Sequence, residues 1–344
     1  MKGLNSLAAT SSARKSRVRC VVFACLLIGL WAISGFLATI PVTGNHTYWR
    51  QFRAWPGDFG LKAEDVSFLS QDGIPLKGWY IRTDGVSRGT VILAHGINGN
   101  RSDMLSRAAA LVRHNYDTLL IDLRDHGQSG GNYAGPGFIE SRDILGALNY
   151  LRSRGQTGPF AAMGHSYGGV AALYAAAQSP DFAAVIADGA FISFEDMVSR
   201  STTLLARDPE RSFWERLGLR LAGFRGVEWV VRPMYYVRTG IWLSARKTDT
   251  LVPISLIGIR PILFIAGERD EICPPQNAAL MFEAARSPEK RLLLVPMAGH
   301  DATYQTAPQL YESTVIRFLE DAFRQPPRRV SKNARIPLSP NVSM

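Results

Sequence analysis

The chain has 344 residues, of which 46% are hydrophobic and 20% are charged, and it contains three cysteines. This composition is typical of a globular protein, and it excludes collagen-like, disordered and disulfide-built chains. The net charge of +10 would suggest a nucleic acid or an anionic surface, but nine of the ten charges lie in residues 1–20 and 325–344, which contain no acid. The body between them has no zinc-ligand spacing and no basic recognition helix, so we expect no nucleic-acid partner.

The first predicted element is a transmembrane anchor at residues 21–40. This segment, VVFACLLIGLWAISGFLATI, carries no charge, and a helix of about 20 residues spans roughly 30 Å of hydrocarbon. Because basic residues 1–20 precede it, the N-terminus is expected in the cytoplasm and the folded domain on the outer, periplasmic or luminal face of a single-pass protein. Arg50 and Arg53 oppose that orientation. The alternative is a signal peptide cleaved after Ala32-Ile33-Ser34, which would give a secreted protein.

Two segments around the body differ from it in composition. Residues 41–61 are rich in turn-forming and aromatic residues, which predicts a juxtamembrane connector. Residues 325–344 mix proline with basic and polar residues and show no periodicity, which predicts a disordered basic tail. One large α/β domain is therefore expected over residues 62–324.

Short apolar runs in the body predict a mostly parallel central sheet flanked by helices. An antiparallel hairpin comes first, at residues 66–69 and 76–81, with Gln71-Asp72-Gly73 between its strands. Further apolar runs follow at residues 90–94, 118–123, 160–163, 183–186, 262–266 and 292–295. Most are separated by helix-length segments, which is typical of an α/β fold whose active site lies beyond the carboxyl ends of the strands.

One interval between predicted strands, residues 186–262, is too long for a single crossover helix. Its aromatic residues include Phe213, Trp214, Trp229, Tyr235, Tyr236 and Trp242. A long segment inside a compact domain is usually a functional insertion. We therefore predict a helical cap at about residues 191–250.

A candidate nucleophile follows the predicted strand at residues 160–163. The sequence GHSYG at residues 164–168 is a G-x-S-x-G motif, and a helical run at residues 170–178 comes next. In this strand, turn and helix context, the glycines allow a sharp turn that presents the serine hydroxyl above the sheet. Ser166 is therefore the predicted nucleophile.

A nucleophilic serine needs a histidine to take its proton and a carboxylate to orient that histidine. His300 follows the last predicted strand, and Asp270 follows the strand before it. Both positions fit the order serine, aspartate, histidine that the motif calls for. Glu268 and Glu271 are the rival acids. Asp188 is a further alternative, which we interpret as a support for the cap entrance.

Two backbone N–H groups are expected to form an oxyanion hole. One belongs to Tyr167, directly after the serine, and the other to Ile97, in the loop HGINGN that follows the strand at residues 90–94. His95, at the start of that loop, is expected to prop the loop and not to act as a base.

A run of ionisable residues and a cysteine are two further candidates for a chemical role. Residues 122–129, DLRDHGQS, carry several ionisable side chains, but no second ligand cluster accompanies them, so we predict a hydrogen-bonded turn and no metal. Cys273 is expected to be an inert cysteine. We expect no cofactor.

The motifs HGINGNR, DLRDHGQS, GHSYGG, IADGAF, AGERDEICPP and AGHD, in this order, resemble the serine hydrolases of the α/β-hydrolase superfamily across residues 62–323. The monoacylglycerol-lipase-like and bud-emergence-protein-like branches are similar. The resemblance implies an α/β-hydrolase fold and hydrolysis of carboxylic esters, or sometimes amides, without a cofactor. The residues that it implies are the triad Ser166, Asp270 and His300 and the oxyanion hole at Ile97 and Tyr167. The longer, aromatic-rich cap departs from the shortest bud-emergence-protein-like pattern.

These features predict a membrane-anchored serine hydrolase that cleaves a lipid-like or hydrophobic ester through an acyl-enzyme on Ser166. A peptidase or amidase is the second hypothesis, for which Glu195, Asp196 and Glu215 in the cap are the candidates to bind an amino terminus. A catalytically inactive fold that serves as a binding module is the third. Its hallmark would be a missing triad member, and all three are present in the sequence.

Overall fold

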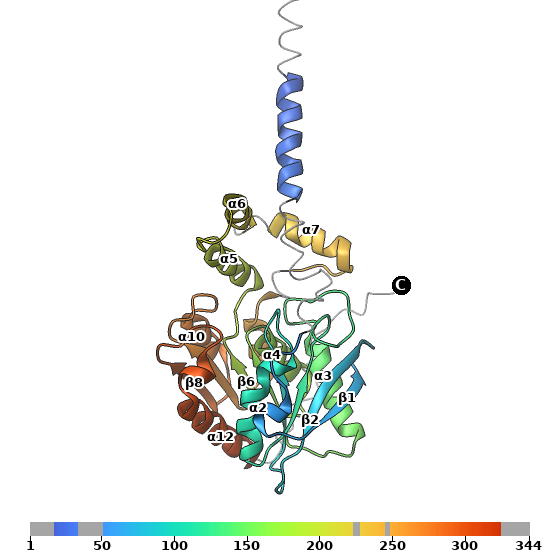
Figure 1. Ribbon diagram of the computed structural model, residues 1–344, viewed down its shortest axis with the longest axis vertical. Coiled ribbons are helices and arrows are strands. Elements are labelled where there is room, and N and C mark those ends of the chain that lie inside the picture. The colour runs from blue at the N-terminus through green and yellow to red at the C-terminus, as the bar shows by residue number, and fades with distance from the viewer. Residues whose placement is uncertain (1–16, 34–50, 223–227, 245–247, 325–344) are drawn as a thin grey trace, which may run out of the picture. The chain divides into compact units, whose positions relative to one another are not determined.

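The computed structural model describes residues 17–33, 51–222, 228–244 and 248–324 (Figure 1). The predicted tail at residues 325–344 and parts of the predicted basic segment, anchor and connector lie outside these ranges. Contacts divide the chain into two compact units. One unit consists of Met1–Pro41 and Thr202–Trp242, and the other of Val42–Ser201 and Leu243–Met344.

The second unit is built on one eight-stranded sheet. Its strands are β1 (Ala63–Leu69), β2 (Pro75–Ile81), β3 (Thr90–Ala94), β4 (Asp117–Ile121), β5 (Phe160–His165), β6 (Phe182–Asp188), β7 (Ile262–Gly267) and β8 (Lys290–Val295). Their order is β1-β2-β4-β3-β5-β6-β7-β8. β2 is antiparallel to β1 and β4, and all other neighbours are parallel. The predicted mostly parallel sheet is confirmed.

Helices cover this sheet along its length. They are α2 (Leu105–Arg113), α3 (Ser141–Ser153), α4 (Tyr167–Gln178), α9 (Leu251–Ile257), α10 (Pro275–Ala284), α11 (Thr303–Thr306) and α12 (Pro308–Arg324), with short 3-10 helices η2 (Pro56–Phe59) and η3 (Arg101–Met104). α4 packs on β5 and β6, α2 on β4, and α10 on β7 and β8. Because the sheet is covered, every residue of β3, β4, β5 and β7 is buried. Burial on both faces explains why these strands are continuous apolar runs in the sequence.

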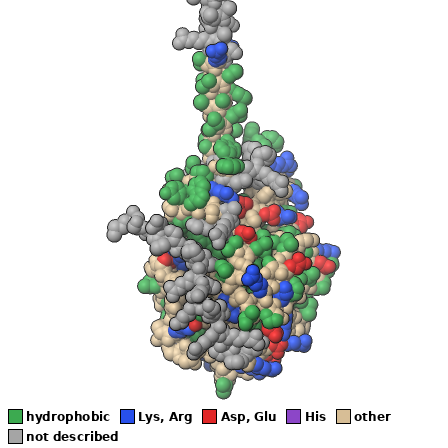
Figure 2. All heavy atoms as spheres, turned by 180° about the vertical axis from the view of Figure 1, so that it is seen from behind, with side chains coloured by type: hydrophobic (Ala, Val, Ile, Leu, Met, Phe, Trp, Pro, Cys, Tyr) green, Lys and Arg blue, Asp and Glu red, His purple; other side chains and the backbone are tan. Residues whose placement is uncertain are grey.

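The segment predicted as a cap contains three helices that the structure describes: α5 (Phe194–Leu205), α6 (Phe213–Ala222) and α7 (Glu228–Thr239). The described part of the N-terminal segment is a helix over residues 17–33, and apolar side chains cover much of its surface (Figure 2). None of the helices in the described ranges has both the length and the apolar character needed to cross a membrane. The predicted anchor also includes residues 34–40, which lie outside the described residues.

One strand ends earlier than its apolar run. The run at residues 118–123 predicts a strand through Leu123, whereas β4 ends at Ile121. The side chain of Asp122 instead accepts hydrogen bonds from the backbone N–H of Arg101 and of Gln128, each at 2.8 Å. These bonds turn the chain out of the sheet.

The sharp turn between β5 and α4 depends on two glycines. A Cβ atom at Gly164 would lie 2.0 Å from the carbonyl oxygen of Gly168, and a Cβ atom at Gly168 would lie 2.4 Å from the carbonyl oxygen of Ala94. Ser166 between them has φ 51° and ψ −116°, in the left-handed half of the map. Such a backbone costs on the order of 1–3 kcal/mol and persists only where neighbouring structure holds it.

We expect Gly168→Ala to destabilise the protein by at least about 3 kcal/mol, at the upper end of overpacking effects, because the atoms that the new methyl group would meet are backbone atoms. The measurement is the free energy of unfolding in urea. Gly57→Ala is the matched control, since a Cβ atom there meets nothing within 4 Å. Equal stability of the two variants would contradict the close approach of β3 and α4.

Candidate active site

The carboxyl ends of three parallel strands of the sheet, β5, β7 and β8, bring the three predicted triad residues together. Ser166 follows β5 at the start of α4, Asp270 follows β7, and His300 lies in the loop after β8. Ser166 Oγ lies 2.8 Å from His300 Nε2. His300 Nδ1 lies 2.7 Å from Asp270 Oδ2. The three side chains, which lie far apart in the sequence, therefore form one continuous series of hydrogen bonds.

The carboxylate of Asp270 is held in place by its own loop. Its Oδ1 accepts hydrogen bonds from the backbone N–H groups of Ile272 at 2.9 Å and Cys273 at 2.7 Å, which leaves Oδ2 for His300. The side chain of Asp270 is fully buried. The rival acids Glu268 and Glu271 are exposed, and Glu268 accepts a bond from the backbone of Met297. Asp270 is thus the carboxylate that contacts His300.

The electrostatics of His300 suit a proton acceptor whose charged form is stabilised. Burial of the ring lowers its pKa, but the hydrogen bond with Asp270 and the neighbouring Cys273 thiol outweigh burial, and the pKa of His300 is raised above its usual value. The imidazolium that forms when the ring takes a proton is therefore stabilised by the adjacent carboxylate. Burial raises the pKa of Cys273, in agreement with an inert thiol.

The loop that carries Ile97 lies beside the serine. A Cβ atom at Gly96 would be 3.5 Å from Ser166 Cβ. His95 is buried; its Nδ1 lies 2.7 Å from the carbonyl oxygen of Gly96, and its Nε2 accepts a bond from the backbone N–H of Leu123 at 3.1 Å. His95 therefore holds the loop, as predicted. Ile97 directly follows Gly96 in this loop and Tyr167 directly follows Ser166, and their backbone N–H groups remain the predicted oxyanion donors.

The segment at residues 122–129 is a structural turn. Asp122 pairs with the guanidinium of Arg101 at 2.7 Å, and both side chains are buried. The guanidinium of Arg101 lies 4.6 Å from the ring centroid of Phe52 and 4.4 Å from that of Trp79. The ion pair with Arg101 holds the carboxylate of Asp122 in place, and the ring contacts hold Arg101 at the end of the loop that begins at His95.

The interpretation of Asp188 as a support for the cap entrance is wrong. Its carboxylate is fully buried and accepts hydrogen bonds from Arg107 at 2.7 Å, Tyr311 at 2.9 Å and Thr303 at 2.9 Å. Burial by itself would raise the pKa of Asp188, but the guanidinium of Arg107 holds it well below its usual range. Arg107 comes from α2, which the sequence alone does not place beside the end of β6.

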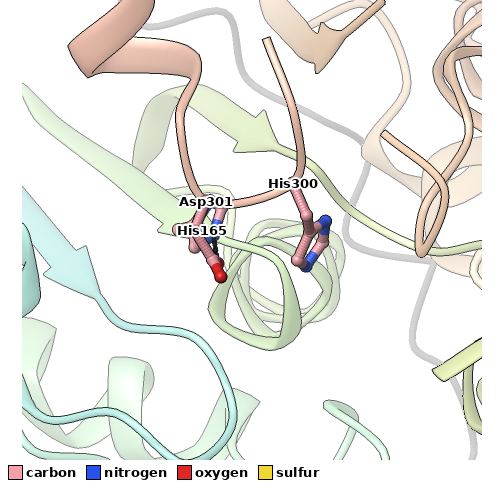
Figure 3. A group of neighbouring side chains, drawn as sticks. All are labelled: His165, His300 and Asp301. Atoms are coloured by element: carbon pink, nitrogen blue, oxygen red, sulfur yellow. Dashed lines mark hydrogen bonds and ion pairs between the residues drawn. The ribbon is translucent and has the colours of Figure 1, made fainter. Parts of the chain in front are cut away.

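Sequence reasoning also passed over His165 and Asp301. Nε2 of the buried His165 ring lies 3.0 Å from Asp301 Oδ1, and the ring centroids of His165 and His300 are 5.3 Å apart (Figure 3). A signal was available, because each of the two residues directly adjoins a predicted triad member: His165 precedes Ser166, and Asp301 follows His300.

His165, His300 and Asp301 also bring three metal-ligand atoms within 4.8 Å of one another. These atoms already have partners in the described structure. His165 Nε2 and Asp301 Oδ1 contact each other, and both ring nitrogens of His300 belong to the series with Ser166 and Asp270. A metal ion would have to displace these hydrogen bonds, so the arrangement favours acid–base chemistry.

Comparison with protein families gives one matching model, Hydrolase_4, described as "Serine aminopeptidase, S33", over residues 85–306. Among relatives, the uncharacterized protein YqkD of Bacillus subtilis is 28% identical over 266 residues, which cover 75% of this chain and 80% of that protein. The α/β-hydrolase domain-containing protein WAV2 of Arabidopsis thaliana is 26% identical, with 77% of this chain and 81% of that protein covered.

Solved structures share the same fold. An esterase of Pyrococcus furiosus has a TM-score of 0.65 at 23% identity, with 79% of this chain and 95% of that chain covered. An esterase of Exiguobacterium antarcticum has a TM-score of 0.52 at 16% identity, with 75% of this chain and all of that chain, 100%, covered. At these identities the likeness extends to the sheet and its helices, and the chemistry must be argued from the side chains described above.

Proposed function

Because this chain belongs to the Hydrolase_4 family, the serine aminopeptidase S33 family of α/β-hydrolases, we propose that it is a serine hydrolase that cleaves a carboxylic ester through an acyl-enzyme on Ser166. Membership of the α/β-hydrolase superfamily, which its motifs predict, is confirmed. The observation that carries the proposal is the series of hydrogen bonds from Ser166 through His300 to Asp270.

The proposed reaction has two halves. In the first, Ser166 Oγ attacks the acyl carbonyl while His300 Nε2 takes the hydroxyl proton and passes it to the leaving alcohol. The backbone N–H groups of Ile97 and Tyr167 bind the oxygen that gains negative charge. In the second half, His300 activates a water molecule that hydrolyses the acyl-enzyme and restores Ser166. Asp270 holds the ring of His300 and stabilises its charged form throughout.

The proposed substrate is a lipid-like or hydrophobic ester. The similar structures from Pyrococcus furiosus and Exiguobacterium antarcticum are esterases. The proposed setting is a membrane, to which residues 21–40 would anchor the chain, with the N-terminus in the cytoplasm and the hydrolase domain on the outer face. The support for it is the uncharged sequence of this segment. The aromatic residues of the predicted cap are suited to an apolar acyl chain.

We expect the full-length chain, purified in a mild detergent, to hydrolyse p-nitrophenyl esters with a kcat/KM that rises from acetate to octanoate. Burial of each added methylene is worth about 0.8 kcal/mol, which corresponds to at most about fourfold per methylene until the pocket is filled. Aminoacyl p-nitroanilides are the comparison substrates. Faster cleavage of the anilides, or a fall in kcat/KM with acyl length, would contradict the proposed substrate class.

The peptidase alternative has less support from the side chains that it needs. Asp196 pairs with Arg200 one turn along its own helix at 2.8 Å. Glu215 accepts a bond from the backbone of Ser212 at the start of α6. Glu195 accepts a bond from Thr248 at 3.2 Å. Each carboxylate thus stabilises its own surroundings, and no observation favours their binding an amino terminus.

A further inference from the structure

The loop that carries His300 is tied down directly after that residue. Asp301 contacts Nε2 of His165, as described above, and Thr303 Oγ1 donates to the carboxylate of Asp188 at 2.9 Å. The loop therefore has two side-chain anchors within three residues of His300.

Both anchors belong to the part of the structure that presents Ser166. His165 is the last residue of β5 and directly precedes the serine, and Asp188 is the last residue of the neighbouring strand β6. The backbone N–H of Ser166 donates to the carbonyl oxygen of Asp188 at 2.6 Å. The same two residues therefore position the backbone of Ser166 and the loop of His300.

Charge strengthens the contact between His165 and Asp301. The ring of His165 lies between two carboxylates, with Nδ1 3.7 Å from Asp188 and Nε2 3.0 Å from Asp301. Burial lowers the pKa of His165, but the two carboxylates outweigh burial and raise it to about 9. The two carboxylates therefore favour the charged form of the His165 ring. Hydrogen bonds between charged partners are shorter and roughly twice as strong as neutral ones.

We propose that His165 and Asp301 form a positioning pair that holds the imidazole of His300 in line with Ser166 Oγ. The inference rests on the proposed function, because it assigns the pair a part in that same reaction. Neither residue exchanges a proton with substrate in the proposed reaction. The two ring nitrogens of His300 contact Ser166 and Asp270. His165 and Asp301 face each other beside that ring (Figure 3).

Because Asp301 is exposed, its replacement can test the positioning of His300 without disturbing the fold. Its side chain is 85% exposed, so its truncation leaves the core of the sheet intact. A displacement of His300 by about 1 Å can nevertheless lower the rate of the chemical step by as much as about 100-fold. Asp301 is therefore the better residue of the pair to replace.

The experiment measures the rate at which a fluorophosphonate probe labels Ser166, together with kcat and KM on a p-nitrophenyl ester, in the full-length protein. We expect Asp301→Ala to lower the labelling rate and kcat by about 10- to 100-fold, with KM changed by less than about twofold, since the pair does not contact substrate. Asp301→Asn, which keeps an acceptor oxygen for His165 without the charge, should recover part of the loss.

Matched controls are Asp84→Asn and His114→Gln, which change exposed residues and should leave the labelling rate unchanged. A double-mutant cycle tests the pair itself: in a His165→Gln background, Asp301→Ala should cost much less than it does alone. Labelling of Asp301→Ala at the parent rate, a loss confined to KM, or effects that multiply in the double variant would overturn the positioning pair. A parent protein that fails to label at all would instead overturn the proposed function, and the pair with it.

Discussion

Ser166→Ala is expected to abolish covalent labelling by a fluorophosphonate and to lower kcat for ester hydrolysis by on the order of 10⁶-fold, the loss typical of a removed nucleophile in a serine hydrolase. The reason is geometric. Ser166 Oγ lies 2.8 Å from Nε2 of His300, so replacing the hydroxyl with hydrogen removes the proton that this nitrogen would accept. The N–H groups that would bind an oxyanion remain, and they account for the residual rate over water.

The measurement is gel fluorescence after labelling, together with initial rates on a p-nitrophenyl ester. Circular dichroism should show an unchanged fold, because alanine takes the same backbone at no greater cost than serine. Ser153→Ala is the matched control, since the hydroxyl of Ser153 is exposed and donates to the carbonyl oxygen of Tyr150 within its own helix. Labelling that persists in Ser166→Ala would mean that another residue reacts and would refute the proposed acyl-enzyme.

Much of the fold could be predicted because four of its central strands, β3, β4, β5 and β7, are buried along their whole length. β3 and β7 contain only apolar residues and glycine apart from Thr90, so hydrophobicity alone marks them. The candidate triad residues could be predicted for a related reason: each follows an apolar run that predicts a strand, and parallel strands end at one edge of the sheet. Hydrophobicity does not predict where β4 ends. The apolar run continues to Leu123, but the hydrogen bonds that Asp122 accepts end the strand at Ile121.

The network beneath the candidate site could not be predicted in the same way. Arg107 and Asp188 are 81 positions apart and belong to different element types, and no local pattern pairs a helix residue with the end of one particular strand. The ion pair depends on how α2 packs on the sheet, which is a property of the whole fold. His165 and Asp301 directly adjoin Ser166 and His300 in the sequence, but the triad motif assigns a chemical role to neither of them.

Asp270→Asn is expected to lower kcat by about 10⁴-fold, as removal of the charge beside a catalytic histidine does in other triads, while KM changes little. Asparagine fits the same space, so its amide can meet the backbone N–H groups of Ile272 or Cys273 only through its oxygen, and its NH₂ group then faces His300. A donor at that position favours the tautomer of His300 with its proton on Nε2, which cannot accept a proton from Ser166.

The pH dependence should distinguish this loss from simple misfolding. His300 acts as a base only when neutral, so kcat/KM rises with pH as its ring loses the proton. Contact with Asp270 raises the pKa of His300, so the midpoint of that rise in the parent should lie above the usual histidine value of about 6.5. In Asp270→Asn the raising charge is gone, and the midpoint of the residual activity should move to lower pH.

Glu268→Gln is the control for this variant, because Glu268 is the exposed rival acid in the same loop and its replacement can still accept the bond from the backbone of Met297. It should keep both the parent rate and the parent midpoint. If Asp270→Asn instead retained more than about a tenth of the parent kcat with an unmoved midpoint, the charge that raises the pKa of His300 would have to come from another carboxylate. Asp188 and Asp301, which flank the adjacent ring of His165, would then be the groups to replace next.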